Sequence, residues 1–144
     1  MKAHIGVDSR NKIIHSVAAS AANIHDSLAL PVLLHGRETC VWGDSAYQGQ
    51  GQVIHQYAPK ARDMTHRRCR YRDRVDLVEQ RKNRYKSQTR AKGEHPFLVL
   101  KRIFGFAKVR YRDMAKNAER LYVACALINI FQLRRPLMRR AALA

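Results

Sequence analysis

The stretch R-Y-K-S-Q-T-R-A-K-G-E-H-P-F-L-V-L-K-R, residues 84–102, sets a single carboxylate, Glu94, among many cations. Arg90 lies one helical turn before Glu94 and Lys101 two turns after it, so on a helix the three side chains fall near one face. A divalent ion on the acid, with cations holding a polyanion beside it, suits a reaction on a phosphodiester. The same spacing also occurs on solvent-exposed helices that carry only i,i+4 ion pairs.

The charge of the whole chain favours a polyanionic partner. Its 144 residues carry a formal net charge of +17. Between residues 60 and 112, eighteen Lys and Arg stand against five acids, so the cations are concentrated in one part of the chain. Such a surplus opposes compaction and favours nucleic acid as a partner. We predict DNA binding by Arg67, Arg68, Arg70, Arg90, Lys101 and Arg102.

The length and the cysteines limit the class of protein. The chain is long enough for one domain or part of one, which we place at residues 1–140 with a tail at 141–144. Cys40, Cys69 and Cys125 are scattered, which favours a reducing compartment over a disulfide framework or a closed zinc site. No secretory signal opens the sequence, and the apolar run 121–133 is too short to span a bilayer. We therefore expect a cytoplasmic protein.

The N-terminal half predicts short strands with acids at their ends. Alternating residues 3–8 and 13–20 predict a hairpin, with Asp8 capping its turn. Asp26 is a good N-cap for a helix over residues 26–36. The apolar run 40–43 reads as a buried parallel strand that stops at Asp44. Asp44 either presents its carboxylate at the sheet edge or N-caps a helix over residues 50–57.

The C-terminal half predicts a further strand at residues 61–65, a cationic loop at 66–74 and two long helices. Tyr71 in the loop either stacks on a base or is an ordinary surface residue. The first helix begins near residue 75, and Pro96 is expected to break it near Glu94. Its expected apolar positions are Val75, Val78, Tyr85, Phe97, Leu98, Leu100, Ile103 and Phe104. The last helix, 114–138, is expected to bury Leu121, Ala124, Leu127, Ile128 and Phe131. This order of elements predicts an α/β fold, a mixed sheet flanked by helices.

The segment around Glu94 resembles the glutamate-bearing signature of the DDE transposases of bacterial insertion sequences. That signature is Tyr, two residues, Arg, three residues, Glu, six residues and Lys. Arg90, Glu94 and Lys101 match it in type and spacing, while Ser87 stands at the Tyr position. G-D-S-A-Y-Q-G resembles the segment that carries the family's second aspartate, at Asp44. M-K-A-H-I-G-V-D-S, A-A-N-I-H-D-S and F-G-F-A-K-V-R-Y-R-D-M-A-K-N resemble its framework segments, so the resemblance extends from residue 2 to about residue 137.

The resemblance implies a ribonuclease-H-like fold and metal-dependent cleavage and transfer of DNA strands in a bacterial cytoplasm. It implies Mg²⁺ or Mn²⁺ held by three carboxylates, with Asp44 and Glu94 as catalytic metal ligands. Arg90 and Lys101 would hold the phosphates near the cut. Members of the family act on the ends of their element and on a target, as dimers or larger assemblies.

The N-terminus departs from the family pattern. The family's first aspartate precedes the K-A-H-I-G-V-D segment with which this sequence opens. We therefore expect a domain that lacks the first strand and its acid, and Asp8 matches a framework position instead. Such a chain is expected to be inactive alone and prone to associate through an open sheet edge. It would be either a decayed remnant or a half joined by frameshifting to an upstream product.

Two other functions fit the sequence. A noncatalytic, basic nucleic-acid-binding protein needs only Lys and Arg for its phosphate contacts. A metal-dependent nuclease on the same fold would cleave DNA without joining it, and a fold alone does not separate these activities.

Overall fold

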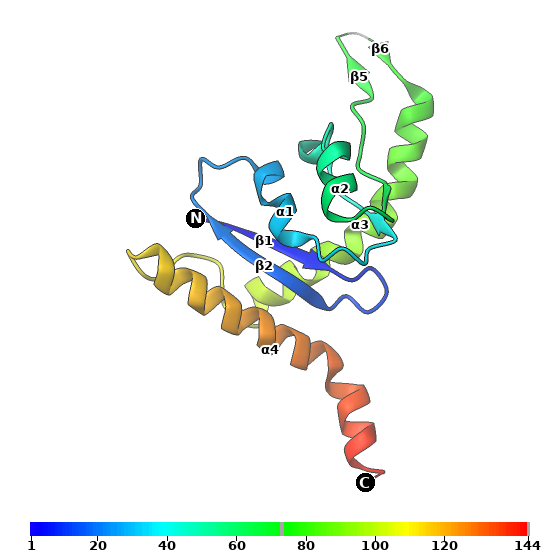
Figure 1. The fold of residues 1–144 in the computed structure, drawn as a ribbon. Coiled ribbons are helices and arrows are strands. Elements are labelled where there is room, and N and C mark those ends of the chain that lie inside the picture. Colours follow the sequence, from blue (N-terminus) through cyan, green and yellow to red (C-terminus); the bar gives the residue numbers. More distant parts are fainter. Residues whose placement is uncertain (73, 144) are drawn as a thin grey trace.

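Short strands and short helices come first along the chain, and two long helices end it (Figure 1). The computed structural model describes residues 1–72 and 74–143. The first half holds β1 (Lys2–Val7), β2 (Ile14–Ser20), the 3-10 helix η1 (Asp26–Ala29), α1 (Leu30–Leu33), β3 (Cys40–Val41), the 3-10 helix η2 (Ser45–Tyr47) and α2 (Gly51–Tyr57). The second half holds β4 (Arg62–Asp63), β5 (Arg70–Tyr71), β6 (Arg74–Val75), α3 (Leu77–Arg102) and α4 (Met114–Ala141).

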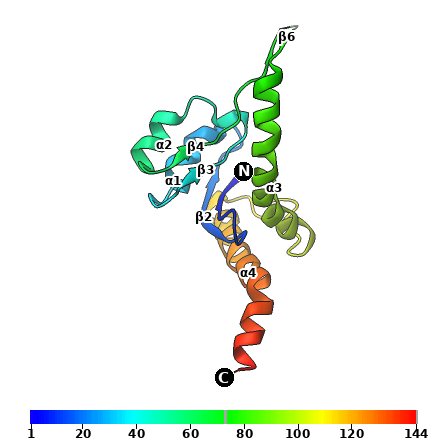
Figure 2. The same cartoon turned by 90° about the vertical axis from the view of Figure 1, so that its right-hand side faces the viewer.

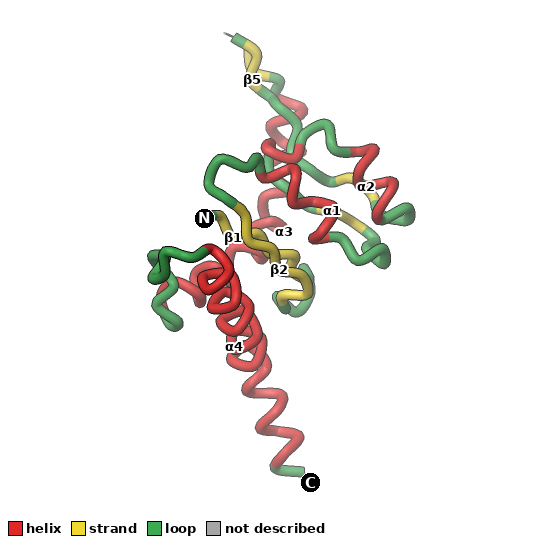
Figure 3. The backbone as a smooth tube through the Cα atoms, turned by 60° about the vertical axis from the view of Figure 1, so that its left-hand side comes forward, coloured by secondary structure: helices red, strands yellow, loops and turns green. Residues whose placement is uncertain are grey.

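The predicted N-terminal hairpin is confirmed. β1 and β2 pair antiparallel from Lys2 opposite Ser20, with a register shift after Gly6. Asp8 closes the turn, where its Oδ1 accepts a hydrogen bond of 2.7 Å from the amide of Arg10. The hairpin lies between α4 on one side and α1 on the other, as Figures 1 and 3 show together. It therefore separates the long C-terminal helix from the smaller α1–α2 half of the molecule.

The single mixed sheet that the sequence predicted is not formed by the described residues. Their strands pair as three separate two-stranded sheets, β1–β2, β3–β4 and β5–β6. The strands expected at residues 40–43 and 61–65 are present as the two-residue β3 and β4, which pair in parallel. Within residues 1–72 and 74–143, β1 pairs only with β2 and β3 pairs only with β4, so each of them has one unpaired edge. An α/β architecture is present, but its sheets are small.

Two hydrophobic clusters hold the molecule together. The larger joins the hairpin to α4 and the second half of α3, with Leu121 and Ile128 completely buried at its centre. The smaller joins α1, β3 and α2 through Leu30, Val41 and Ile54. Burying a side chain of this size contributes about 2 kcal/mol.

Helix α3 is continuous through Pro96, contrary to the expected break near Glu94. The helix begins after Asp76, whose Oδ1 accepts hydrogen bonds from the amides of Val78 and Glu79. A proline inside a helix costs about 3 kcal/mol. Pro96 is completely buried, beside Val99 and Leu100. Packing on this face offsets that cost and keeps the helix intact.

Several expected core positions of the long helices are exposed instead. The solvent-exposed ones are Val75, Val78, Tyr85, Leu98, Ile103 and Leu127. The first half of α3 extends away from the rest of the chain (Figure 2), and among the described residues its apolar stripe belongs to neither cluster. Leu121, Ala124 and Ile128 are buried as predicted.

Helix α4 is tied to the hairpin by an amide side chain. Asn129 accepts a hydrogen bond of 2.9 Å from the amide of Ile14 and donates one of 2.8 Å to its carbonyl. The side chain thus pairs with the backbone N–H and C=O of Ile14 in β2 as the backbone of a neighbouring strand would. No helix of the described chain combines the length and the apolar character needed to cross a membrane.

Candidate functional site

Asp44 lies at the end of a parallel pair of chain segments. Beyond β3 and β4, the pairing continues through hydrogen bonds from the amide of Met64 to Val41 (2.9 Å) and from the amide of His66 to Gly43 (3.0 Å). Asp44 follows directly and caps η2, where its Oδ1 accepts 2.9 Å from the amide of Ala46. The cap therefore serves η2 rather than the helix at residues 51–57. One carboxylate oxygen holds the turn, and Oδ2 is left for other contacts.

Glu94 lies on the second half of α3, where Arg90 joins it to Asp44. Arg90 Nη2 is 2.8 Å from Glu94 Oε1, and Arg90 Nη1 is 3.9 Å from Asp44 Oδ2. Two carboxylates that are far apart in the sequence therefore meet at one guanidinium. The side chains of Asp44 and Glu94 are 43% and 60% exposed, so the pair is open to a ligand from solvent. Arg90 Nε is buried and has no hydrogen-bond partner among the described residues.

A cavity of about 270 Å³ adjoins the carboxylate pair. Asp44, Arg90 and Glu94 line it together with apolar residues of β1, α1, β3 and α3, among them Ile5, Leu33, Val41 and Phe97. Apolar walls lower the local dielectric constant and strengthen charge interactions beside them. The three charged groups thus lie at the border between this cavity and solvent.

His66 is a neighbour of the pair that the sequence did not single out. Burial lowers its pKa, the positive charges of Arg90 and Lys86 lower it further, and Asp44 opposes them. Its Nε2 is 3.4 Å from the hydroxyl of Ser87, at the position where the family signature has Tyr. A neutral imidazole adds no charge to the site. His66 stands in a run of cations, and nothing in that run marks it as different from its neighbours.

The predicted cations divide into two groups. Lys101 and Arg102 lie on α3 with Glu94, and Lys101 lines a shallow depression that Glu94, His95 and Leu98 also line. Arg67 and Arg68 precede β5, and Arg70 is its first residue. The predicted loop at residues 66–74 contains β5 and the first residue of β6, and Asp73 within it falls outside the described residues.

Asp44 and Glu94 are the two carboxylates of this site that could hold a divalent cation. Mg²⁺ prefers oxygen ligands and is commonly held by one or two carboxylates with water and substrate phosphate. Asp44 and Glu94 supply such oxygens beside a shared cation. Both carboxylate oxygens of Asp8 accept hydrogen bonds within the hairpin turn. Among the residues that the structure describes, no group of three His, Cys, Asp or Glu side chains is placed to hold a metal.

Acid is expected to destabilise the fold through three histidines. Burial is the largest cause that lowers the pKa of His4, His15 and His66. The unfolded chain, with ordinary pKa values of about 6.5, then binds protons more readily than the folded one, so stability falls as the pH drops below about 6.5. Melting temperatures measured between about pH 8 and about pH 5 should show this fall, and His4→Gln should reduce it. A melting temperature that is flat across this range would contradict the expectation.

A comparison with protein-family models finds a match over most of the chain. The family model described as "Transposase DDE domain" matches residues 1–130. No solved structure matches the chain.

Proposed function

We propose that Asp44 and Glu94 hold a divalent ion for cleavage and transfer of DNA strands. The premise is that the chain belongs to the family of transposases with a DDE domain. The membership indicates a transposase function and a DNA substrate. We propose further that the ion is Mg²⁺ or Mn²⁺ and that the fold is of the ribonuclease-H type. The roles given to individual residues below are part of the same proposal.

The observation that carries the proposal is the meeting of both carboxylates at Arg90. Without such a meeting the two acids would have no common ligand. A divalent ion, when bound, stabilises charge on a phosphate and lowers the pKa of an attacking water. Arg90 already lies between the carboxylates, so it is placed to pair with a phosphate that approaches them. Its planar guanidinium suits two-point contact with phosphate oxygens.

Lys101 and Arg102 extend the cationic surface along the same helix. Both are exposed, and Lys101 lines a depression beside Glu94. A DNA strand whose phosphate lies at the carboxylates has its next phosphates within reach of these side chains. Contacts of this kind position the backbone without reading its sequence.

Metal binding by single variants tests the proposal. Asp44→Ala and Glu94→Ala should each weaken Mn²⁺ binding at least about tenfold, because each removes one of two protein ligands. DNA affinity measured in EDTA should stay within about threefold of the wild type, since neither acid contacts phosphate without the ion. Titration calorimetry and fluorescence anisotropy give the two values. Asp8→Ala is the matched control and should leave both unchanged.

The opposite pattern favours a noncatalytic nucleic-acid-binding protein. The observation behind that alternative is the +17 charge, which suffices for phosphate contacts. Unchanged Mn²⁺ binding in both variants, with DNA binding intact, would establish it in place of the transposase. An assay that contains both of the DNA ends to be joined distinguishes a protein that only cleaves DNA from one that cleaves and then joins it.

A further inference from the structure

The β5–β6 hairpin stands away from the rest of the molecule, at the N-terminal end of α3 (Figures 1 and 2). Its strands are two residues long, and their side chains are exposed. None of its described residues belongs to either hydrophobic cluster. An isolated two-stranded hairpin is at best marginally stable in water. Apolar packing therefore does not account for this segment.

Polar contacts fix the base of the hairpin on α3. The side-chain amide of Asn83 donates 2.7 Å to the carbonyl of Arg67 and accepts 3.2 Å from its amide. Lys86 Nζ donates 2.8 Å to the carbonyl of Thr65. The amide of Asp76 donates 2.8 Å to the carbonyl of Cys69 and closes the base. The hairpin is thus attached to one level of the helix that also carries Glu94.

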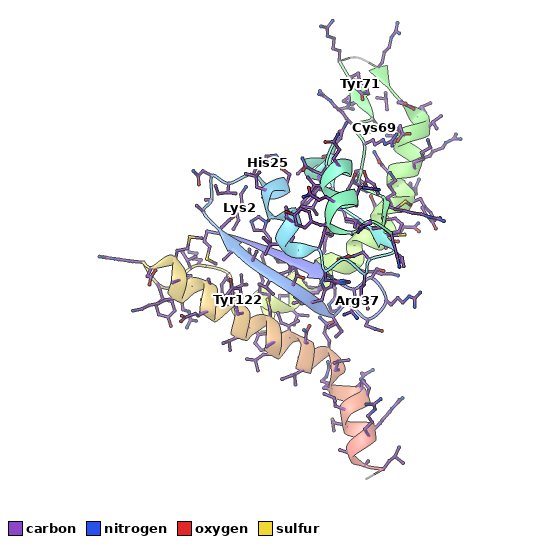
Figure 4. All side chains as sticks on the ribbon, in the orientation of Figure 1. Lys2, His25, Arg37, Cys69, Tyr71 and Tyr122 are labelled. Carbon is purple, nitrogen blue, oxygen red and sulfur yellow. The ribbon has the colours of Figure 1, made fainter. Side chains whose placement is uncertain are left out.

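The segment that forms the hairpin is strongly cationic, with five Arg against Asp73 and Asp76 in residues 67–76. Arg67, Arg68, Arg70, Arg72 and Arg74 fall within eight residues, and all five are exposed. Arg68 lies over the ring of Tyr71 at 5.7 Å from its centre, and Tyr71 itself is on the outlying hairpin (Figure 4). Clustered like charges repel one another, and phosphates relieve that repulsion. A polyanion is the ligand that this surface fits.

We propose that the β5–β6 hairpin is a second DNA contact, which holds the duplex backbone about seven base pairs from the phosphate at Asp44 and Glu94. The distance follows from α3, which covers about 25 Å between its first residue and Glu94 at 1.5 Å per residue. A duplex that lies along α3 advances about 3.4 Å per base pair. The inference rests on the proposed action on DNA. It adds that the same DNA is held at two separate points.

Dependence of binding on duplex length tests the proposal. A duplex of about 16 base pairs reaches both points, whereas one of about 5 base pairs covers only about 17 Å and does not, so the wild type should bind the longer at least about tenfold more tightly. The triple variant Arg70→Ala, Arg72→Ala, Arg74→Ala should lose this advantage. For binding of this variant to the longer duplex, the slope of log affinity against log salt concentration should be smaller in magnitude by about 3. Anisotropy in EDTA keeps the measurement independent of metal.

A control with the same loss of charge separates the hairpin from a diffuse basic surface. The triple variant Arg135→Ala, Arg139→Ala, Arg140→Ala acts on the C-terminal end of α4, at the other end of the molecule (Figure 1). It should keep the advantage of the longer duplex. An advantage retained in the hairpin variant, or lost equally in the control, overturns the second contact and leaves the proposed function standing. Absence of wild-type binding to either duplex overturns both.

Discussion

Arg90→Ala is expected to tighten Mn²⁺ binding about thirtyfold and to weaken DNA binding. Arg90 now places a positive charge between Asp44 and Glu94, at 3.9 Å and 2.8 Å from their oxygens. A divalent ion there would meet that charge at about 4 Å, a repulsion of about 2 kcal/mol even at the dielectric constant of water. Removing the guanidinium removes this repulsion, together with one phosphate contact. The slope of DNA affinity against salt should therefore fall by about 1.

The opposite signs of the two changes make this prediction informative. A variant that merely unfolds would lose both affinities, and circular dichroism checks that it has not. Lys92→Ala is the control, because Lys92 is exposed on α3 but lies on the face opposite Glu94. It should change Mn²⁺ affinity less than about threefold. If Arg90→Ala weakens Mn²⁺ binding, Arg90 positions the carboxylates and does not compete for them.

Asn117→Ala is expected to lower the free energy of unfolding by about 3 kcal/mol. Asn117 is 2% exposed on the first turn of α4. Its Oδ1 accepts from the amides of Arg110 and Tyr111 at 3.1 and 3.2 Å. Its Nδ2 donates to the carbonyls of Tyr111 and Asp113 at 2.6 and 2.7 Å. Alanine leaves these four backbone groups without their partner in the loop that joins α3 to α4.

Denaturant unfolding measures this loss. A domain of this size has a total stability of about 5–15 kcal/mol, so 3 kcal/mol is a large part of it. Asn11→Ala is the matched control, because Asn11 is exposed and its side chain has one long contact of 3.4 Å with Asp8. It should cost less than about 0.5 kcal/mol. A loss below about 1 kcal/mol in Asn117→Ala would show that water replaces the amide.

The two acids of the site were predictable because their local surroundings are encoded locally. Asp44 follows a short apolar run, and Glu94 has Arg90 one turn away on a helix. Their convergence depends on where the fold places the end of β3 relative to α3, over a long separation in sequence. The place of His66 beside the pair was not predictable, because it too depends on tertiary structure. Its lowered pKa comes from burial and from charges on α3. The metal and phosphate roles of these residues remain predictions.

The errors in the fold have one physical origin. Pro96 carries a strong local signal for a break, and the burial of Pro96 with Val99 and Leu100 overrides it. Val78 and Tyr85 carry an apolar signal, and the first half of α3 extends beyond any partner that could bury them. In each case the local pattern favours one structure, and the tertiary surroundings of the residue favour another that prevails.

By itself the sequence determined the order of the strands and helices other than β5 and β6, the N-terminal hairpin, the acids at 44 and 94 and the concentration of positive charge. These depend on residues that are close along the chain. The tertiary structure alone decided that Arg90 joins both carboxylates, that the strands form three small sheets, and that Asn83, Asn117 and Asn129 bond the backbone of distant or adjoining segments. An amide side chain fits almost any polar position. Its partner is therefore fixed only when packing brings an unpaired backbone group within reach.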